Sequence, residues 1–334
     1  MPVTVIVGGQ FGGEGKGKVS HYLASEMGAK VAVRVGGSNS GHTVITPEGE
    51  PLILRQLPTP SILPNIHCVL GAGSYIDVDI LFDEISKTSI SEDRLHIDPN
   101  AVIVTEEDKN SEEKSSLRPA IGSTLSGTGA AVARRISRDG TTRLAKDDDR
   151  LASYVRPVVP YMRDQLSQGK RIIIEGTQGF GLSLLHSQYY PYATSRDTSA
   201  AAFVSEAGLS PLDVDDVVLV IRNYPIRVGG NSGPLPNEID WAAVTDESKS
   251  SENLIEFTSV TKTERRVARF DSDIVVQAIV VNQPTRIVMN HLDYIDCEAT
   301  DLTQNRMNFC RLVESKINRK IDFIGYGRDK IKRF

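Results

Sequence analysis

The sequence predicts an α/β fold in which a mostly parallel central sheet carries helices on both faces. Two observations predict it: short runs of β-branched residues alternate with amphipathic stretches, and a glycine-rich segment joins the first run to a helical pattern. Apolar strands that alternate with helices are typical of parallel sheets covered on both sides. The glycine-rich segment adds a phosphate site that resembles a P-loop.

Each element follows from these patterns in chain order. We expect one continuous domain over residues 1–334 with loop insertions, because no linker-like change of composition interrupts the chain. The charged segment 105–116 and the Gly-, Pro- and Asn-rich segment 227–236 are the expected flexible regions, and the acidic run 147–149 is expected as a solvated turn. The predicted strands cover 3–7, 31–35, 101–104, 171–174, 217–221 and 286–289, and the predicted helices cover 19–27, 151–166 and 273–281.

Composition excludes several classes of protein. The net charge is −5 and the pI is near 5.8, so the broad basic surface of a duplex-DNA binder is not expected. No stretch approaches the roughly 18 apolar residues of a membrane span. The three cysteines, Cys68, Cys297 and Cys310, are far apart without CxxC spacing, and the histidines form no HExxH motif. We therefore expect a cytoplasmic protein with no nucleic-acid or membrane partner.

The first glycine-rich segment, GGQFGGEGKGKV at 8–19, directly follows a predicted strand. Glycines let backbone N–H groups turn toward a phosphate, and the N-terminus of the following helix adds partial positive charge. Lys16 and Lys18 can neutralise phosphoryl oxygens. The spacing matches GxxxxGK, but Val19 stands where a Walker A loop has Ser or Thr for Mg²⁺.

A second glycine-rich segment, RVGGSNSGHT at 34–43, follows the next predicted strand. Asn39 offers an amide for base or ribose recognition. A lone histidine is usually structural, but the position of His42 among glycines favours phosphate contact or acid catalysis.

With these two segments, the chain resembles the adenylosuccinate synthetase family. Further matching blocks follow in family order over nearly the whole length, although the chain is shorter than typical bacterial members. They are IGSTLSGTGAA at 121–131, EGTQG at 175–179, YPYATSRDTSA at 190–200, IRVGGNSGPLPNEI at 226–239, TSVTKTERR at 258–266, NHLD at 290–293 and GYGR at 325–328.

The resemblance implies a ligase that uses GTP and Mg²⁺ to phosphorylate the 6-oxygen of IMP, after which the amino group of aspartate displaces phosphate. It implies catalytic roles for Lys16 at the transferring phosphoryl group, His42 at the 6-oxygen and Gln178 at the 6-position. Arg138 matches an arginine that the neighbouring subunit contributes, which implies a homodimer.

The binding residues that the resemblance implies fall into four groups. The triphosphate group is Gly12, Gly13, Gly15, Lys16, Gly17, Lys18, Gly41, His42, Thr43, Asn290, Leu292, Asp293, Gly325 and Gly327. The nucleoside monophosphate group is Gly13, Asn39, Ser123, Thr124, Arg138, Gln178, Thr194 and Val228, and the metal group is Gly13 and Gly41. The aspartate group is Thr258, Ser259, Val260, Thr261, Thr263 and Arg265, of which Arg265 can bind a carboxylate through both guanidinium nitrogens.

The chain departs from the family at Gly13, where the family has an aspartate that takes the N1 proton of IMP and helps to hold Mg²⁺. An ordinary member that lost this carboxylate should lose most of its rate. A guanine base carries a 2-amino group beside N1, and replacing Asp with Gly is expected to clear volume for it. Water, Ser126 or the phosphate of the substrate remain candidates for the replacement base.

Two further departures concern the ribose and the donor. Thr263 replaces an arginine that touches the ribose hydroxyl in the family, which suits a deoxyribonucleotide. Together with Gly13, it resembles the viral branch of the family, 2-aminoadenylosuccinate synthetase, which condenses dGMP with aspartate for diaminopurine synthesis. The guanine-recognising motif of the family is altered to NHLD at 290–293 and its terminal serine matches Gly325, so ATP or dATP is favoured over GTP as donor.

Three functions stay open from the sequence. The first is the ligase that joins aspartate to dGMP, in host cytoplasm if the source is viral. The second is a short adenylosuccinate synthetase that uses IMP and GTP and must replace the missing carboxylate. The third is a non-catalytic nucleotide-binding regulator, which would have no need to retain Lys16, His42, Arg138, Gln178 and Arg265 together.

Overall fold

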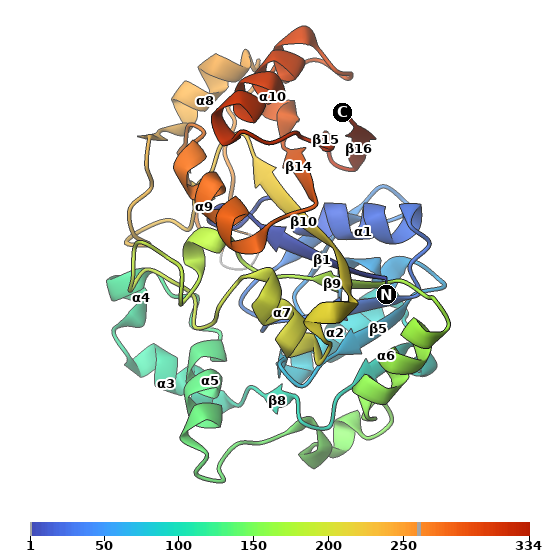
Figure 1. Cartoon of the computed structure of the whole chain (residues 1–334). Helices are drawn as coiled ribbons and strands as arrows, with labels where there is room; N and C mark the ends of the chain where they lie inside the picture. The colour runs from blue at the N-terminus through green and yellow to red at the C-terminus, as the bar shows by residue number, and fades with distance from the viewer. Residues whose placement is uncertain (1, 259–261) are drawn as a thin grey trace.

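Nine strands form one central sheet, which runs through the middle of the molecule (Figure 1). The structure is a computed structural model that describes residues 2–258 and 262–334. The strands are parallel except for the last, which pairs antiparallel with its neighbour. In spatial order they are β16 (Lys330–Arg333), β15 (Phe323–Tyr326), β14 (Arg286–Asn290), β10 (Val214–Arg222), β1 (Val3–Gly8), β9 (Ile172–Glu175), β2 (Val31–Arg34), β5 (His67–Leu70) and β7 (Leu95–Ile97).

Helices cover both faces of this sheet because both faces of its central strands are apolar. Val3, Val5 and Val7 of β1 pack into one core with helices α6 (Val158–Ser167), α7 (Ala200–Ala207), α9 (Ser272–Asn282) and α10 (Gln304–Ile317). Ile6, on the opposite face of β1, packs with α1 (Lys16–Glu26) and α2 (Val78–Thr88). The observed architecture confirms the predicted α/β fold.

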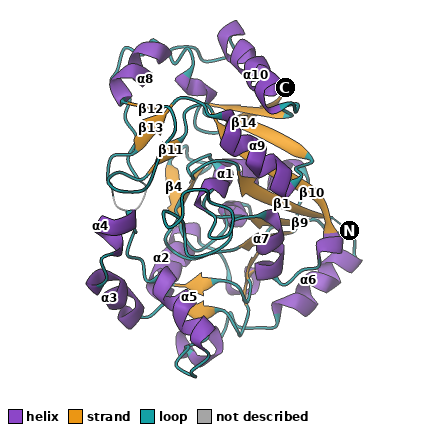
Figure 2. Ribbon diagram, turned by 60° about the vertical axis from the view of Figure 1, so that its left-hand side comes forward, coloured by secondary structure: helices purple, strands orange, loops and turns teal. Residues whose placement is uncertain are grey.

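Smaller sheets and helices surround the central sheet. Figure 2 shows α3 (Glu106–Lys114), α4 (Leu117–Ile121) and α5 (Thr128–Ser137) on one side and α8 (Trp241–Ser248) at the other end. The small sheets pair β3 (His42–Ile45) with β4 (Pro51–Leu54), and β6 (Tyr75–Ile76) with β8 (Val102–Ile103). A third small sheet has the order β11 (Ile226–Arg227), β13 (Arg266–Ala268) and β12 (Glu238–Ile239).

Several local predictions are wrong. The run 101–104 does form a strand, β8, as predicted, but that strand lies outside the central sheet. The helix expected from residue 151 begins at Val158, after Pro157. The charged segment expected to be flexible forms α3, whose Thr105 and Asp108 make a reciprocal capping box. The acidic run is not simply solvated, because Asp148 is buried and accepts hydrogen bonds from Arg150.

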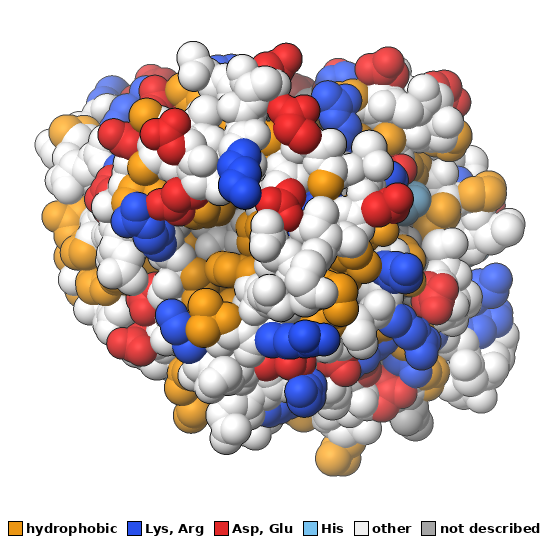
Figure 3. Space-filling view, turned by 90° about the horizontal axis from the view of Figure 1, so that it is seen from above, with side chains coloured by type: hydrophobic (Ala, Val, Ile, Leu, Met, Phe, Trp, Pro, Cys, Tyr) orange, Lys and Arg blue, Asp and Glu red, His pale blue; other side chains and the backbone are white. Residues whose placement is uncertain are grey.

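The remaining observations agree with the compositional analysis. All three cysteines are free. Within residues 2–258 and 262–334, no helix is long and apolar enough to cross a membrane. On the face seen from above in Figure 3, basic and acidic side chains are interspersed.

Candidate active site

A cavity of about 640 Å³ opens where the carboxyl ends of the central strands meet. The loops that follow β1, β2, β9, β10 and β14 begin at this edge, and it is where open parallel sheets bind ligands. Most of the predicted site residues line the cavity. They are Gly12, Gly13, Gly15, Lys16, Gly17, Lys18, Asn39, Gly41, His42, Thr43, Thr124, Gln178, Val228, Thr258, Arg265, Asp293 and Gly327.

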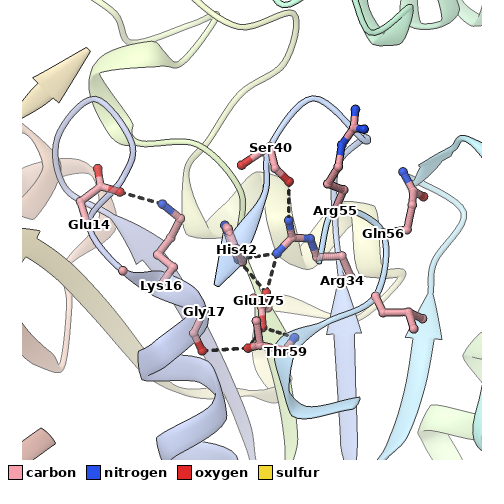
Figure 4. Close-up of polar contacts among 12 residues, drawn as sticks. Glu14, Lys16, Gly17, Arg34, Ser40, His42, Arg55, Gln56, Thr59 and Glu175 are labelled. Carbon is pink, nitrogen blue, oxygen red and sulfur yellow. Dashed lines mark hydrogen bonds and ion pairs between the residues drawn. The ribbon is translucent and has the colours of Figure 1, made fainter. Parts of the chain in front are cut away.

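The phosphate loop is shaped by a buried carboxylate. Glu14 is fully buried, and its Oε1 accepts hydrogen bonds from the backbone N–H groups of Gln10 (3.1 Å) and Gly12 (2.8 Å). Its Oε2 accepts a 2.7 Å bond from Nζ of Lys16, as Figure 4 shows. Gly15 has a φ of 84°, which glycine adopts at little cost, and α1 begins directly after it. The loop therefore holds the Lys16 ammonium at the N-terminus of a helix, a suitable position for phosphoryl oxygens.

Lys18 lies at the other side of the loop. Its Nζ donates a 3.2 Å hydrogen bond to the carbonyl oxygen of Gly327, in the C-terminal motif. Burial lowers the pKa of Lys18 to about 8, although Asp293 and Asp329 act in the opposite direction. A triphosphate bound here would favour the charged form of Lys18 and so be bound more tightly by it.

His42 is fixed by a buried polar cluster. Its Nδ1 lies 2.7 Å from Oε1 of Glu175 and also contacts Nη1 of Arg34 (Figure 4). Oε2 of Glu175 accepts from the hydroxyl (2.7 Å) and backbone N–H (2.9 Å) of Thr59. The other ring nitrogen, Nε2, is therefore the one left for a ligand in the cavity that His42 lines.

Electrostatics in this cluster favour a neutral imidazole next to an ionised carboxylate. Burial, and then the positive charge of Arg34, lower the pKa of His42 to about 4. Burial alone would raise the pKa of Glu175, but the hydrogen bond with His42 and the charge of Arg34 lower it to about 2. Glu175 thus stays charged and orients the ring.

The pKa of His42 predicts how acid affects stability. Its pKa falls from the ordinary 6.5 to about 4 in the folded protein, so between these values the unfolded chain binds a proton that the folded chain does not. The free energy of unfolding should therefore decrease as the pH falls from 6.5 toward 4. Thermal unfolding midpoints across this range should fall less steeply in His42→Gln than in the unsubstituted protein. An equal dependence of the unfolding midpoint on pH in the two proteins would contradict the lowered pKa of His42.

The space beside Gly13 is not empty, contrary to the expectation that glycine clears volume there. A Cβ atom on Gly13 would lie 2.4 Å from Cδ1 of Ile226 and 2.8 Å from Nη1 of Arg265. The carbonyl oxygen of Gly13 accepts a 2.9 Å hydrogen bond from Nη1 of Arg222. The side chains of Ile226 and Arg265 occupy the volume that a larger residue would need.

Arg265 lies in a second charged cluster at this end of the cavity. Its Nη1 is 3.4 Å from Oε2 of Glu256, which also accepts a 3.3 Å bond from Nη1 of the fully buried Arg222. The hydroxyl of Tyr294 donates a 2.7 Å bond to the other oxygen of Glu256. Burial alone would raise the pKa of Glu256, but Arg222 and its hydrogen bond lower it to about 2.

Several predicted residues do not line the cavity. Arg138 is exposed at the C-terminal end of α5, and Asn290 is fully buried and donates to the carbonyl oxygens of Glu14 (2.9 Å) and Gly15 (3.3 Å). The Oγ of Ser126 contacts Thr124 and Thr128, not the cavity. Ser123, Thr194, Thr263, Leu292 and Gly325 also lie outside the lining, and Ser259, Val260 and Thr261 lie outside the described residues.

Sequence reasoning gave no role to several residues in or next to the cavity. Glu175 was part of a matched block without a role, although a charged residue at the end of a buried strand is a signal that can be recognised. Glu175 lies behind His42 and not in the lining, whereas Ile226, Glu256 and His291 line the cavity, and Glu256 pairs with Arg265. Their importance depends on contacts between segments far apart in the chain, which no local spacing reveals.

The two residues predicted to hold Mg²⁺ at the phosphate loop are glycines, so they could contribute only backbone oxygens to an ion carried mainly by its nucleotide. Within the described part of the chain, no group of three or more His, Cys, Asp or Glu side chains could hold a metal. The Gly13 carbonyl is already bonded to the cationic Arg222, which disfavours it as a cation ligand, and Gly41 lines the cavity. Mg²⁺ commonly binds through substrate phosphates and water with few protein ligands, which suits this site.

Comparisons with known proteins agree with this geometry. The family model for adenylosuccinate synthetase matches residues 5–146 and 141–300. The adenylosuccinate synthetase of Methanococcus aeolicus is 36% identical over 98% of this chain and 97% of its own length. That of Thermococcus sibiricus is 35% identical over 98% of this chain and 96% of its own length.

Two solved structures share the fold. Cyanophage S-2L succinoaminodeoxyadenylate synthetase, bound to dGMP and dATP as an energy donor, is 29% identical with a TM-score of 0.84, over 99% of this chain and 95% of that chain. Fully ligated adenylosuccinate synthetase from Plasmodium falciparum is 20% identical with a TM-score of 0.89, over 100% of both chains. The chain belongs to the adenylosuccinate synthetase family of C–N bond-forming, Mg²⁺-dependent ligases.

Proposed function

We propose that this ligase joins L-aspartate to C6 of dGMP, driven by a purine triphosphate, with ATP or dATP favoured over GTP. The observation that carries the proposal is Gly13, where ordinary family members have the carboxylate that takes the N1 proton of IMP. Ile226 and Arg265 fill the adjoining space, so no carboxylate fits there without rearrangement. The cyanophage enzyme of the same fold, bound to dGMP and dATP, supports this choice of substrates.

The reaction would proceed in two steps. The 6-oxygen of the purine attacks the γ-phosphorus of the triphosphate, the nucleoside diphosphate leaves, and the N1 proton of the purine passes to water or to the phosphate of the substrate. The amino group of aspartate then attacks C6, inorganic phosphate leaves, and the proton of the new C–N nitrogen is lost. The 6-oxygen is a poor leaving group, and conversion to a phosphate ester makes the substitution feasible.

We assign the following roles in this reaction to residues of the cavity and to Arg138. Lys16, released from Glu14 toward the phosphates, would stabilise charge on the transferring group, and Nε2 of His42 would bind the 6-oxygen region. Gln178, which also lines the cavity, would contact the 6-position. When bound, Mg²⁺ would neutralise charge on the triphosphate. Arg138, exposed on α5, would reach the monophosphate of a partner subunit in a homodimer.

The rival function is an ordinary adenylosuccinate synthetase that uses IMP and GTP, favoured by the archaeal relatives at 35–36% identity. One assay separates the two. Purified protein with Mg²⁺ and aspartate is given dGMP or IMP, each with ATP, dATP or GTP, and phosphate release and product mass are measured. An aspartyl adduct of dGMP supports the proposal. Turnover of IMP alone supports the rival, and no turnover of either favours the nucleotide-binding regulator.

Arg265→Ala should raise the KM for aspartate by about 10-fold or more, with a smaller effect on the KM for dGMP. The physical reason is that a guanidinium–carboxylate hydrogen bond to a charged group contributes roughly 1.5–3 kcal/mol. Initial rates at varied aspartate provide the measurement, and Arg269→Ala, an exposed arginine paired with Glu247, is the matched control. An unchanged aspartate KM would place the amino-acid site elsewhere.

A further inference from the structure

The contact between Gly13 and Ile226 joins two segments that are far apart in the chain. Gly13 belongs to the loop after β1, and Ile226 begins β11. Both line the cavity. A Gly13 Cβ would lie 2.4 Å from Cδ1 and 3.1 Å from Cγ1 of Ile226, so a side chain at position 13 requires the isoleucine to shift.

Ile226 cannot simply retreat. Its side chain is 3% exposed and packs with Trp241, Val244 and Val267 in a small apolar core. Its backbone pairs with Val267 of β13 in the small antiparallel sheet. A rotation away from position 13 would push its methyl groups against this core or into the cavity, and either change is costly in a packed interior.

The backbone at position 13 adds a separate cost, which Gly12 allows one to measure. Gly13 has a φ of 70° and Gly12 a φ of 92°, so any other residue is strained at either position. A Cβ on Gly12, however, would meet only Cδ1 of Leu182, at 3.9 Å. Gly12→Ala therefore tests strain alone, whereas a substitution at Gly13 tests strain together with collision.

We infer that Ile226 is a specificity-determining residue for the purine monophosphate and that it acts with Gly13 as one unit. This inference rests on the proposed function, in which the edge of the purine that carries N1 and C2 faces Gly13. At that edge the substrate meets the methyl groups of Ile226 and not a carboxylate. The side chain of Ile226 determines how much space a C2 substituent of the purine has. It also disfavours an acidic side chain at position 13 of the phosphate loop.

The test is a double-substitution cycle with Gly13→Asp, Ile226→Ala and both together. Turnover of dGMP and IMP is measured as kcat/KM, and thermal unfolding is measured without ligand. Gly13→Asp alone should lower kcat/KM for dGMP by about 100-fold and lower the unfolding midpoint. Ile226→Ala alone should reduce the preference for dGMP over IMP by about 10-fold, the range expected for a few methyl groups.

The two substitutions should not be additive. In the double variant, Ile226→Ala should raise the unfolding midpoint of Gly13→Asp and increase its IMP turnover at least 10-fold, since the carboxylate then has space. Val267→Ala is the matched control, because it trims the same small core outside the cavity and should rescue neither property. Additive effects on both readouts, or an equal rescue by Val267→Ala, would overturn the inference.

The outcomes also separate this inference from the proposed function. Suppose that the unsubstituted protein turns over IMP but not dGMP, while the unfolding midpoints of the variants remain non-additive. The proposed function would then be contradicted, but the steric coupling of Gly13 and Ile226 would be supported. Turnover of dGMP with additive substitutions would support the function and contradict the unit. If Gly13→Asp affects stability no more than Gly12→Ala, the collision with Ile226 is absent and the inference fails.

Discussion

Replacing His42 with asparagine should lower kcat by about 10²–10⁴-fold while the protein stays folded, because proton transfer or hydrogen bonding at the 6-oxygen is lost. Asparagine is polar and smaller than histidine, and it can still bond to Glu175, which would otherwise lose a partner. The KM for both nucleotides should change much less than kcat. Pre-steady-state formation of the nucleoside diphosphate, compared with the later release of phosphate, would show whether the first step is the one that slows.

A variant of Glu175 separates the orientation of the His42 ring from the chemical role of its imidazole. Glu175→Gln keeps the shape of the side chain but removes the negative charge that holds Nδ1 of His42. As a positioning residue, Glu175 should affect kcat and its pH profile more than the KM values. A His42→Asn variant with near-normal kcat would show that His42 has a structural role only.

Lys16→Met should lower kcat by about 10²–10³-fold, the loss typical when a positioned donor to transition-state charge is removed. The substitution also removes the ion pair with the buried Glu14, and an unpaired buried charge is strongly destabilising. The unfolding midpoint should therefore fall together with the rate. Steady-state rates and thermal unfolding are measured on the same preparation.

The double variant Glu14→Gln/Lys16→Met separates these two effects. With the carboxylate neutral, the buried charge is gone and the unfolding midpoint should recover. The rate should not, because the ammonium is still missing. Recovery of the rate would mean that Lys16 serves only to neutralise Glu14, and that another group stabilises the phosphoryl transfer.

Local signals predicted the parts of this protein that depend on local geometry. The strand over residues 3–8 and its glycine-rich loop were readable because apolar runs and glycine spacing determine backbone conformation. Even the missed helix α3 carried a readable signal, since Thr105 and Asp108 have capping-box spacing, but its high charge suggested a flexible segment.

The contacts on which the proposed specificity rests could not be predicted from the sequence. Nothing near Gly13 in the chain indicates that Ile226 and Arg265 fill the adjoining space, and Glu256 gives no local sign that it pairs with Arg222. Such contacts come from the way separate loops meet at one edge of the sheet. The chemical groups that each loop contributes can be recognised in the sequence, whereas the space left between the folded loops cannot.

Glu256 affects the charge of the proposed amino-acid site when no ligand is bound. By accepting from both Arg222 and Arg265, it acts as an internal counter-ion, so the resting site offers little free positive charge to passing anions. If Arg265 binds the amino acid as proposed, an incoming dicarboxylate would displace Glu256 from Arg265, while Arg222 would remain paired with Glu256. Binding at this end of the cavity would then be an exchange between ion pairs, in which the ligand carboxylate replaces Glu256 as the partner of Arg265.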